Sequence, residues 1–299
     1  MKIVILSRGP QLYSTQSLLR AGMRRGHQVR IIDHVNCHFT IQKGRMSIFH
    51  DGFLVDTPDA IIPRIGSSVT AKGAAVIAQF EAMNMITTVR SMALLQARDK
   101  LRCLQKLASC GIDVPKTAYL HNNEHLPAVI NQLGGLPVVI KLLESTHGVG
   151  VILAETLKTA ESTIEVFQKL RERVLLQEFI EESNGADIRV LVVAGKVVAA
   201  MKRQAQAGEF RSNLHRGASA EAVRITQQEK NLVIRATKIM GLDIAGVDLL
   251  RSERGPLVME INASPGLEGI ETITKVDVAG QVIRYLESRY RLKKEYANQ

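Results

Sequence analysis

Acidic and amide side chains lie in two apolar runs near the end of this 299-residue chain, on either side of residues 252–256. The glycine and proline of that short segment favour a tight turn, so the two runs predict a β-hairpin. If the turn is centred on Arg254, Asp248 faces Glu260, and Asn262 follows on the same side. Facing carboxylates repel unless a cation lies between them. Carboxylate and amide oxygens are ligands that Mg²⁺ prefers, so the hairpin predicts a metal site, the alternative being a solvated acidic face.

The same centring places the apolar residues of the hairpin. It pairs Leu249 with Met259 and puts both, with Val247, on the face opposite to the carboxylates. It puts Leu250 and Val258 beside the carboxylates. We therefore expect the acidic face to be partly buried, which favours a bound cation over free solvation.

A second candidate is a lysine beside a glycine-rich loop. An apolar run ends at Lys141, and the small residues of 145–150 follow before the next apolar run, 151–154. A lysine at a strand end next to such a loop can direct a cation and several backbone N–H groups at phosphate oxygens. No G-K-[ST] is present, so this is not a Walker loop, and a plain hairpin is the alternative.

Residues 208–217 form a polar segment rich in arginine, asparagine and histidine. This density of donors indicates anion binding, and a mobile surface loop is the alternative.

The elements that must position these residues begin with a βαβ unit. Its first turn has no G-x-G-x-x-G, so the dinucleotide-binding fingerprint is missing. Hydrophobic periodicity predicts a first α/β domain at residues 1–95. Its expected elements are strands at 3–6, 28–33 and 60–65, helices at 11–25 and 71–84, and a hairpin at 47–55.

Later elements follow from the same patterns. They are helices at 93–109, 156–171 and 226–240, a strand at 174–177, a hairpin at 187–203 turning at Ala194-Gly195, and a C-terminal helix through 284–294.

Composition limits the class of protein. With 45% hydrophobic and 23% charged residues, the chain is typical of a globular protein of two or three domains. Aromatics are only 4% and tryptophan is absent, which argues against base stacking, so no direct nucleic-acid binding is expected. Three cysteines without a C-x-x-C pair and a short N-terminal apolar run predict a cytoplasmic protein without a membrane span. The net charge of +10 indicates anionic partners.

Several segments together resemble the ATP-grasp ligases, and more closely the RimK family. The segments are Ala97-Arg98-Asp99-Lys100, the lysine and its glycine-rich loop, 177–180, 187–189, 210–217, the acidic hairpin and 262–270. The resemblance implies an α/β (α+β) fold in which a pre-ATP-grasp domain, 1–95, precedes a two-lobed ATP-grasp domain, 96–299. The lobes would be a central one at about 96–185 and a C-terminal one at about 186–299. Enzymes of this family add glutamate to the C-terminus of the sixth small-subunit ribosomal protein.

The resemblance also implies roles for single residues. Lys100 and Lys141 would hold the phosphates of ATP, and Arg211 with Lys141 would act on the transferred phosphoryl group. The metal ligands for two Mg²⁺ or Mn²⁺ ions would be Asp248, Glu260 and Asn262. The remaining nucleotide-binding positions would be Ser145, Gly148 and Gly150 over the phosphates, Glu178, Phe179, Ile180 and Glu181 at the adenine, Asp187 at the ribose, and Ser212 and Asn213 near the γ-phosphate. His147 departs from the smaller or amide side chain that relatives carry in this loop.

The expected reaction is an ATP-dependent ligation of L-glutamate to a C-terminal carboxylate, with an acylphosphate intermediate. Phosphoryl transfer needs positioning and charge neutralisation, which lysines, an arginine and metal ions supply. The partners would be L-glutamate and the C-terminal tail of a ribosomal protein, and a homo-oligomeric state is left open by the sequence. Alternatives remain open: a ligase acting on a small carboxylic acid or an amino-acid carrier protein, or a non-catalytic ATP-binding regulator.

Overall fold

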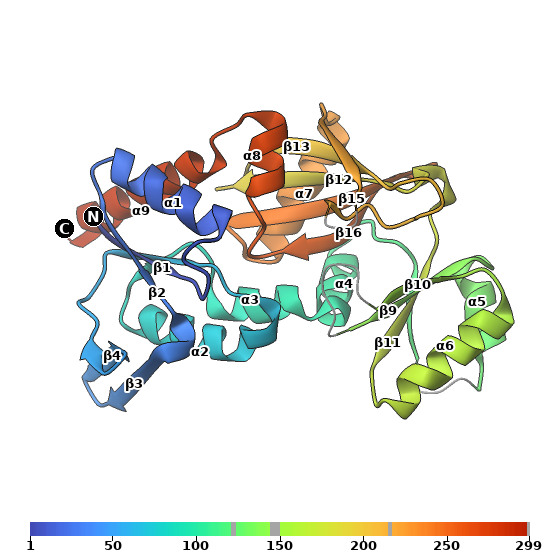
Figure 1. Ribbon diagram of the computed structural model, residues 1–299, viewed down its shortest axis with the longest axis horizontal. Coiled ribbons are helices and arrows are strands. Elements are labelled where there is room, and N and C mark those ends of the chain that lie inside the picture. The colour runs from blue at the N-terminus through green and yellow to red at the C-terminus, as the bar shows by residue number, and fades with distance from the viewer. Residues whose placement is uncertain (121–123, 144–149, 215–216, 298–299) are drawn as a thin grey trace.

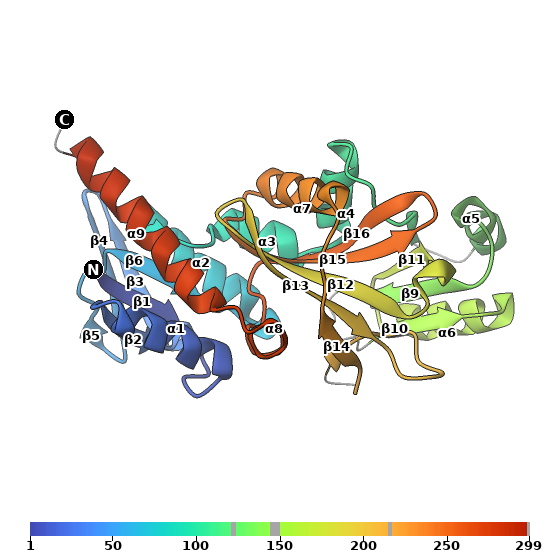
Figure 2. The same cartoon turned by 90° about the horizontal axis from the view of Figure 1, so that it is seen from above.

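The computed structural model describes residues 1–120, 124–143, 150–214 and 217–297. Four β-sheets are present in these ranges. A sheet near the N-terminus and a sheet flanked by α5 and α6 lie at opposite ends of the molecule, with the largest sheet between them (Figures 1 and 2). The cavity described below opens where these three regions meet.

The N-terminal sheet is parallel, with the order β2-β1-β6-β7, and confirms the predicted βαβ opening. Its elements are β1 (Lys2–Leu6), α1 (Tyr13–Arg24), β2 (Gln28–Ile32), β6 (Ala60–Pro63), α2 (Thr70–Ala82) and β7 (Ile86–Thr87). A small antiparallel sheet joins β3 (Cys37–Gln42), β4 (Arg45–His50) and β5 (Phe53–Leu54). The β4–β5 hairpin turns at Asp51 and Gly52, as predicted, because both adopt positive φ. Strand β3 was not expected from the sequence.

The single helix predicted at 93–109 is wrong. The chain forms α3 (Ser91–Arg98) and α4 (Lys100–Ser109), separated by Asp99 in an extended conformation. The Asp99 carboxylate accepts a hydrogen bond from the Arg102 backbone N–H at 3.0 Å, so it caps the second helix. The break turns Arg98 and Lys100, on either side of Asp99, into the cavity.

The central lobe is an antiparallel sheet with the order β10-β9-β11-β8. Helices α5 and α6 pack on it, and their apolar residues form a core with Ile140 and Leu176 that is separate from the other cores of the described residues. The lobe consists of β8 (Thr117–Leu120), α5 (Leu126–Leu133), β9 (Val138–Leu142), β10 (Val151–Ala154), α6 (Leu157–Lys169) and β11 (Val174–Glu178).

The C-terminal lobe is a larger antiparallel sheet with the order β14-β13-β12-β15-β16. The hairpin of β12 and β13 turns at Ala194 and Gly195, as predicted. Helix α7 begins after a capping box in which Thr226 and Glu229 bond reciprocally. The elements are β12 (Ala186–Val193), β13 (Lys196–Gln204), β14 (Ser219–Ala222), α7 (Gln227–Ile239), β15 (Ile244–Ser252), β16 (Gly255–Asn262), α8 (Glu268–Thr274) and α9 (Val278–Ala297).

The C-terminal lobe and the N-terminal domain share their apolar cores. One core joins Leu6 and Ile77 to Val190 and Val247. A second core includes Ile283 of α9, which runs back across the molecule to pack beside α1 (Figures 1 and 2). The chain therefore folds into one broad body and one central lobe with a core of its own.

The domain boundaries at residues 95 and 96 and at 185 and 186 stay predictions. Within the described ranges, no helix is long and apolar enough to cross a membrane. All three cysteines, which lie in these ranges, are free thiols.

Candidate active site

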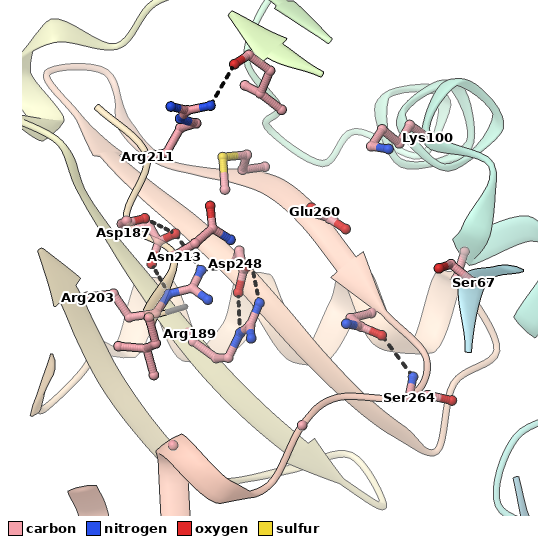
Figure 3. A pocket seen from close by; sticks show the side chains of 18 of the residues that line it. Ser67, Lys100, Asp187, Arg189, Arg203, Arg211, Asn213, Asp248, Glu260 and Ser264 are labelled. Atoms are coloured by element: carbon pink, nitrogen blue, oxygen red, sulfur yellow. Dashed lines mark hydrogen bonds and ion pairs between the residues drawn. The ribbon is translucent and has the colours of Figure 1, made fainter. Parts of the chain in front are cut away.

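A cavity of about 740 Å³ is lined by the N-terminal domain, the central lobe and the C-terminal lobe. Its size is in the range of small-molecule sites, and polar side chains from all three parts converge on it. Lys100 of α4, Asp187 and Arg189 of β12, Asp248 of β15 and Glu260 of β16 line this one space (Figure 3).

The acidic hairpin has the predicted central register but a different register toward the turn. Asp248 is paired with Glu260, as expected. A β-bulge follows, so Leu249 pairs with Val258 and not with Met259. Val258 therefore lies in the core and Met259 lines the cavity, the reverse of the sequence prediction. The physical reason is the extra residue of a bulge, which moves the residues beyond it to the other face.

Asp248 is buried, and two arginines donate hydrogen bonds to its carboxylate. Arg189, which is paired with it across β12 and β15, donates from Nε at 2.8 Å and from Nη2 at 2.7 Å. Arg203 Nη2 donates to the same carboxylate at 3.0 Å. Burial opposes ionisation of Asp248, but the two guanidiniums outweigh it and hold the pKa of this carboxyl below its usual range.

Asp187 shares this network. It is paired with Arg203 across β12 and β13, and Arg203 donates to it from Nε at 2.6 Å and from Nη2 at 2.5 Å. The Ser212 hydroxyl also donates to Asp187 at 2.6 Å. Both carboxylates are thus neutralised by arginines at the base of the cavity, so the network is a rigid support for the groups above it.

Glu260 and Asn262 differ from Asp248 in their environment. Glu260 is exposed in the cavity and has no hydrogen bond or ion pair with another described residue. Asn262 Oδ1 accepts from the Ser264 backbone N–H at 3.0 Å. An unpaired carboxylate opposite a second carboxylate, with an amide oxygen beside them, is a donor set that suits Mg²⁺ bound with phosphate oxygens. The residues present therefore fit a divalent cation.

Lys141 is the last residue but one of β9, close to the strand end that the sequence predicted, and its side chain lines the cavity. Its Nζ donates to Gln177 Oε1 at 2.5 Å, and Gln177 Nε2 donates to the Thr117 hydroxyl at 2.8 Å. Burial is the main reason that the pKa of Lys141 falls to about 8, and Lys100 adds to the effect while Glu260 opposes it. A buried lysine among these groups is suited to binding an anion, which would raise its pKa again.

The chain after Lys141 returns through Gly150, whose carbonyl accepts from the Leu142 N–H at 2.9 Å. Gly150 has φ +67°, and a Cβ there would lie 2.4 Å from Leu142 Cδ1, so only glycine fits. Ser145, His147 and Gly148 lie outside the described residues.

The break between α3 and α4 places Lys100 in the same cavity as Lys141. Its Nζ donates to the Leu143 carbonyl at 3.1 Å, and burial lowers its pKa. Two cations from different elements therefore face the cavity together, as the sequence predicted for the phosphates.

The segment after β11 connects the two lobes. Glu178, Phe179 and Ile180 line the cavity, and Glu181 is exposed at the start of the next turn. The Glu178 carboxylate is bonded to the Arg254 guanidinium at the tip of the acidic hairpin. The hairpin tip thus lies against the connection between the lobes.

Arg211 and Asn213 lie on the polar segment that follows β13, and both line the cavity. Arg211 pairs with Glu209 at 2.6 Å and donates from Nη1 to the Val151 carbonyl of β10 at 3.3 Å (Figure 3). Its guanidinium also lies 5.5 Å from the Phe210 ring centroid. The segment therefore bridges from the C-terminal lobe to the central lobe above the cavity.

Some cavity residues were not among the sequence candidates. Arg203 had no local signal, because the predicted turn places Lys202 opposite Asp187 and a β-bulge between Leu191 and Val192 shifts the pairing to Arg203. Arg189 depends on a pairing between distant strands, and Arg64, Arg98 and Ser264 come from three separate segments. No local pattern could have brought these last residues together.

Two parts of the sequence match the models of two domains of one protein family. Residues 1–94 match the RimK pre-ATP-grasp domain, and residues 97–286 match the RimK-like ATP-grasp domain. The chain belongs to the RimK family. It is accordingly an ATP-dependent ligase of the ATP-grasp type, which removes the non-catalytic regulator from the alternatives.

Relatives align over almost their whole length. A probable alpha-L-glutamate ligase of Syntrophotalea carbinolica is 57% identical over 287 residues, which are 96% of this chain and 95% of the relative. A probable alpha-L-glutamate ligase 1 of Hahella chejuensis is 53% identical over 294 residues, which are 98% of this chain and 97% of the relative.

Solved structures share the fold. The ATP-grasp ligase PsnB, complexed with precursor peptide PsnA2 and AMPPNP, has a TM-score of 0.76 at 22% identity, over 97% of this chain and 98% of PsnB. D-alanine–D-alanine ligase from Bacillus anthracis, complexed with ATP, has a TM-score of 0.71 at 17% identity, over 99% of each chain. These likenesses confirm the predicted fold class: an N-terminal α/β domain followed by an ATP-grasp domain.

Proposed function

We propose that this RimK-family ligase adds L-glutamate to the C-terminal carboxylate of an acidic-tailed protein, the sixth small-subunit ribosomal protein. One observation carries the proposal: Lys100 and Lys141 face the Asp248–Glu260 hairpin across a single cavity. That arrangement suits the phosphates of ATP and a carboxylate that receives the γ-phosphoryl group. The names of the relatives, which are glutamate ligases, supply the amino acid.

In this proposal the central lobe binds ATP. Lys100 and Lys141 hold the phosphates, and the loop with Ser145, Gly148 and Gly150 closes over them. The connection from Glu178 to Glu181 contacts the adenine. Charge-assisted hydrogen bonds from the lysines to phosphate are the strongest single contacts in this set.

Two residues that are proposed to bind the nucleotide already have other partners in the structure. Asp187, proposed for the ribose, already accepts from Arg203 and Ser212. Arg211, proposed for the transferred phosphoryl group, already pairs with Glu209. We infer that bound ATP competes for these donors and acceptors.

Asp248, Glu260 and Asn262 would hold two Mg²⁺ or Mn²⁺ ions. When bound there, the ions would neutralise charge on the phosphates and on the acceptor carboxylate. Arg189 and Arg203 keep Asp248 ionised and fix its orientation. Glu260, which has no such partner, supplies the negative charge that is free to balance a cation.

The proposed chemistry has two steps. The acceptor carboxylate oxygen attacks the γ-phosphorus of ATP, the bond from that phosphorus to the bridging oxygen breaks, and ADP leaves. The amine of L-glutamate then attacks the acyl carbon, phosphate leaves with the former carboxylate oxygen, and the amine loses a proton. The lysines stabilise the charge that moves to the phosphate oxygens in the first step. The product carries a new free carboxylate, so it can serve again as an acceptor.

The acceptor is proposed to be acidic because the chain carries a net charge of +10. Long-range attraction would steer an acidic tail to such a surface, more strongly at low salt. PsnB, which shares the fold, is named as a complex with a precursor peptide. A cytoplasmic location and a homo-oligomeric state remain predictions.

The test is an assay of purified enzyme with ATP, Mg²⁺, L-glutamate and a peptide ending in the acidic tail of the ribosomal protein. We expect peptide masses that increase by whole glutamate residues, with one ADP formed for each. A peptide of the same length with the acidic residues changed to lysine is the control, and we expect it to be a poor acceptor. ATP- and glutamate-dependent ligation to a small carboxylic acid, with no peptide extended, would contradict the proposal and favour the small-acid alternative.

A further inference from the structure

Two arginines on the N-terminal side of the cavity have no carboxylate partner. Arg64 follows β6, and its Nη2 donates to the Pro265 carbonyl at 2.8 Å. Arg98 ends α3, and its Nη2 donates to the Ile65 carbonyl at 2.6 Å. Among the described residues, no carboxylate lies within ion-pair distance of either guanidinium, although both side chains line the cavity. Within those ranges the pair therefore lacks a contacting counter-ion, and the charge of Glu260 acts on Arg98 only from beyond ion-pair distance.

The same wall holds polar atoms without partners. Arg98 Nε and Ser264 Oγ are buried, and neither has a hydrogen-bond partner in the described part of the chain. A buried donor left unpaired costs about 1–3 kcal/mol, so such atoms mark a place where a ligand supplies the missing partner. Burial lowers the pKa of Arg64 to about 10, with a smaller effect from Arg98, which reflects the same missing anion.

The position of this wall also favours a ligand site. Arg64 and Ser7 lie just beyond the carboxyl ends of β6 and β1, which are parallel neighbours. Ligands of parallel sheets bind outside the carboxyl ends of the strands. Arg64 and Ser7 line the cavity together with Glu260 and Ser264.

We propose that Arg64 and Arg98 bind the α-carboxylate of the incoming L-glutamate, with Ser264 donating a further hydrogen bond. This inference rests on the proposed function. The α-carboxylate is separated by one carbon from the attacking amine, so it must lie next to the reaction centre at Glu260. The γ-carboxylate is farther from the amine and does not have this constraint. The acidic residue Glu268 also lines the cavity but pairs with neither arginine, so the two cations are free to hold an anion.

The experiment compares steady-state kinetics of Arg64→Gln and Arg98→Gln with those of the unaltered enzyme, using the acidic peptide as acceptor. We expect KM for L-glutamate to rise about 10- to 100-fold, as for a lost charge-assisted hydrogen bond. KM for ATP and for the peptide should stay within about twofold, because those ligands lie elsewhere in the cavity. Arg98→Lys should fall between, since it keeps the charge but loses the planar fork.

A matched control removes a charge from the same region but outside the cavity. Arg8 is exposed, and its Nη2 donates to the Ser68 hydroxyl at 3.2 Å. Arg8→Gln loses the same charge without touching the proposed site, so KM for L-glutamate should not change. A thermal unfolding midpoint for each variant shows whether the fold is retained.

Alternative donors identify which carboxylate the pair binds. L-Isoglutamine lacks the α-carboxylate charge, and L-glutamine lacks the γ-carboxylate charge. We expect Arg98→Gln to lose discrimination against L-isoglutamine while its discrimination against L-glutamine stays as in the unaltered enzyme.

Three results would overturn the inference. If KM for the peptide or for ATP rises while KM for L-glutamate does not, the arginines bind a different substrate. If Arg8→Gln has the same effect as Arg98→Gln, the charge acts only at long range. If the unaltered enzyme adds glutamate and both variants keep its KM for L-glutamate, the proposed function stands and the assignment of the two arginines is wrong. If the unaltered enzyme adds no glutamate, both the proposed function and the assignment are wrong.

Discussion

The central lobe and the C-terminal lobe differ in how they are held. The central lobe has an apolar core of its own, built from α5, α6 and their sheet. The C-terminal lobe shares two cores with the N-terminal domain, and α9 packs against both β12 and β13 of this lobe and α1 of the domain. The candidate metal ligands therefore lie on the larger body, while Lys141 and Gly150 lie on the lobe that has a core of its own.

The contacts between these two regions are few and local. A small cluster of Leu104, Leu143 and Leu175 joins α4 to the central lobe. The ion pair of Arg254 with Glu178 joins the hairpin tip to the connection between the lobes. Arg211 reaches the Val151 carbonyl from the other side. The core of the central lobe is therefore separate from the core that supports the acidic hairpin.

The largest expected effect is on the acidic hairpin. Glu260→Gln should lower turnover on the order of a thousandfold, because stabilisation by metal charge amounts to several kcal/mol. The fold should be retained, since the Glu260 side chain is exposed and has no partner in the described residues. Initial rates of ADP release and a thermal unfolding midpoint measure the two properties.

Asp248→Asn is the informative companion to Glu260→Gln. It would leave Arg189 and Arg203 partly uncompensated and should also destabilise the fold. Near-normal Mg²⁺-dependent ADP release by Glu260→Gln would place the metal site elsewhere.

The next effect concerns the separate core. Leu176→Ala should destabilise the central lobe by about 2–5 kcal/mol, the usual result for a buried leucine. Leu6→Ala is the matched change in a shared core, since both side chains are fully buried. Hydrogen exchange should show faster opening only in the central lobe for Leu176→Ala, but in both the N-terminal domain and the C-terminal lobe for Leu6→Ala. Equal loss of protection throughout the chain for both variants would contradict the division into two bodies.

A smaller effect is expected at Lys141, which is proposed to hold the phosphates of ATP. Lys141→Ala should weaken ATP binding by about 1.5–3 kcal/mol, the value of a hydrogen bond to a charged group. Lys158→Ala, which removes an exposed lysine from α6 of the same lobe, is the control. Calorimetric titration with ATP measures both, and an unchanged affinity for Lys141→Ala would mean that this lysine only supports Gln177.

The smallest effect is expected where the two regions touch. Arg254→Ala removes the ion pair with Glu178, and an exposed pair is worth about 0–1 kcal/mol. We expect KM for ATP to rise by a few-fold, with the unfolding midpoint nearly unchanged. Arg251→Ala is a useful contrast, because Arg251 pairs with Glu229 within the C-terminal lobe. A larger effect of Arg251→Ala on KM for ATP would show that the contact between the lobes is not important.

Much of this arrangement could be predicted from local pattern. Alternation along the strands placed Asp248 opposite Glu260, and a lysine before a glycine-rich loop marked the phosphate side. The bulge that turns Met259 into the cavity could not be predicted, because it depends on how β16 packs under the rest of the sheet. The break at Asp99 had a signal in the capping preference of aspartate, which the helical periodicity outweighed.

The remaining residues needed the tertiary fold. Arg189 reaches Asp248 only because β12 and β15 are neighbours. Arg64 and Arg98 meet because α3 packs against α2, which brings Arg98 to the carbonyl of Ile65, the residue after Arg64. Local propensity carries no information about such pairings between distant segments, whereas the residues that face each other in one hairpin follow from the turn except where a bulge shifts the register.

The central claim is that an acceptor carboxylate is phosphorylated by ATP between the two regions. It is tested most directly with an acidic peptide whose C-terminal carboxylate carries heavy oxygen, incubated with enzyme, ATP, Mg²⁺ and L-glutamate. If the reaction passes through an acylphosphate, the first glutamate added to each labelled peptide releases a phosphate that carries one labelled oxygen. Mass spectrometry of the phosphate measures this transfer. Glutamate addition with no label in the phosphate would contradict the account.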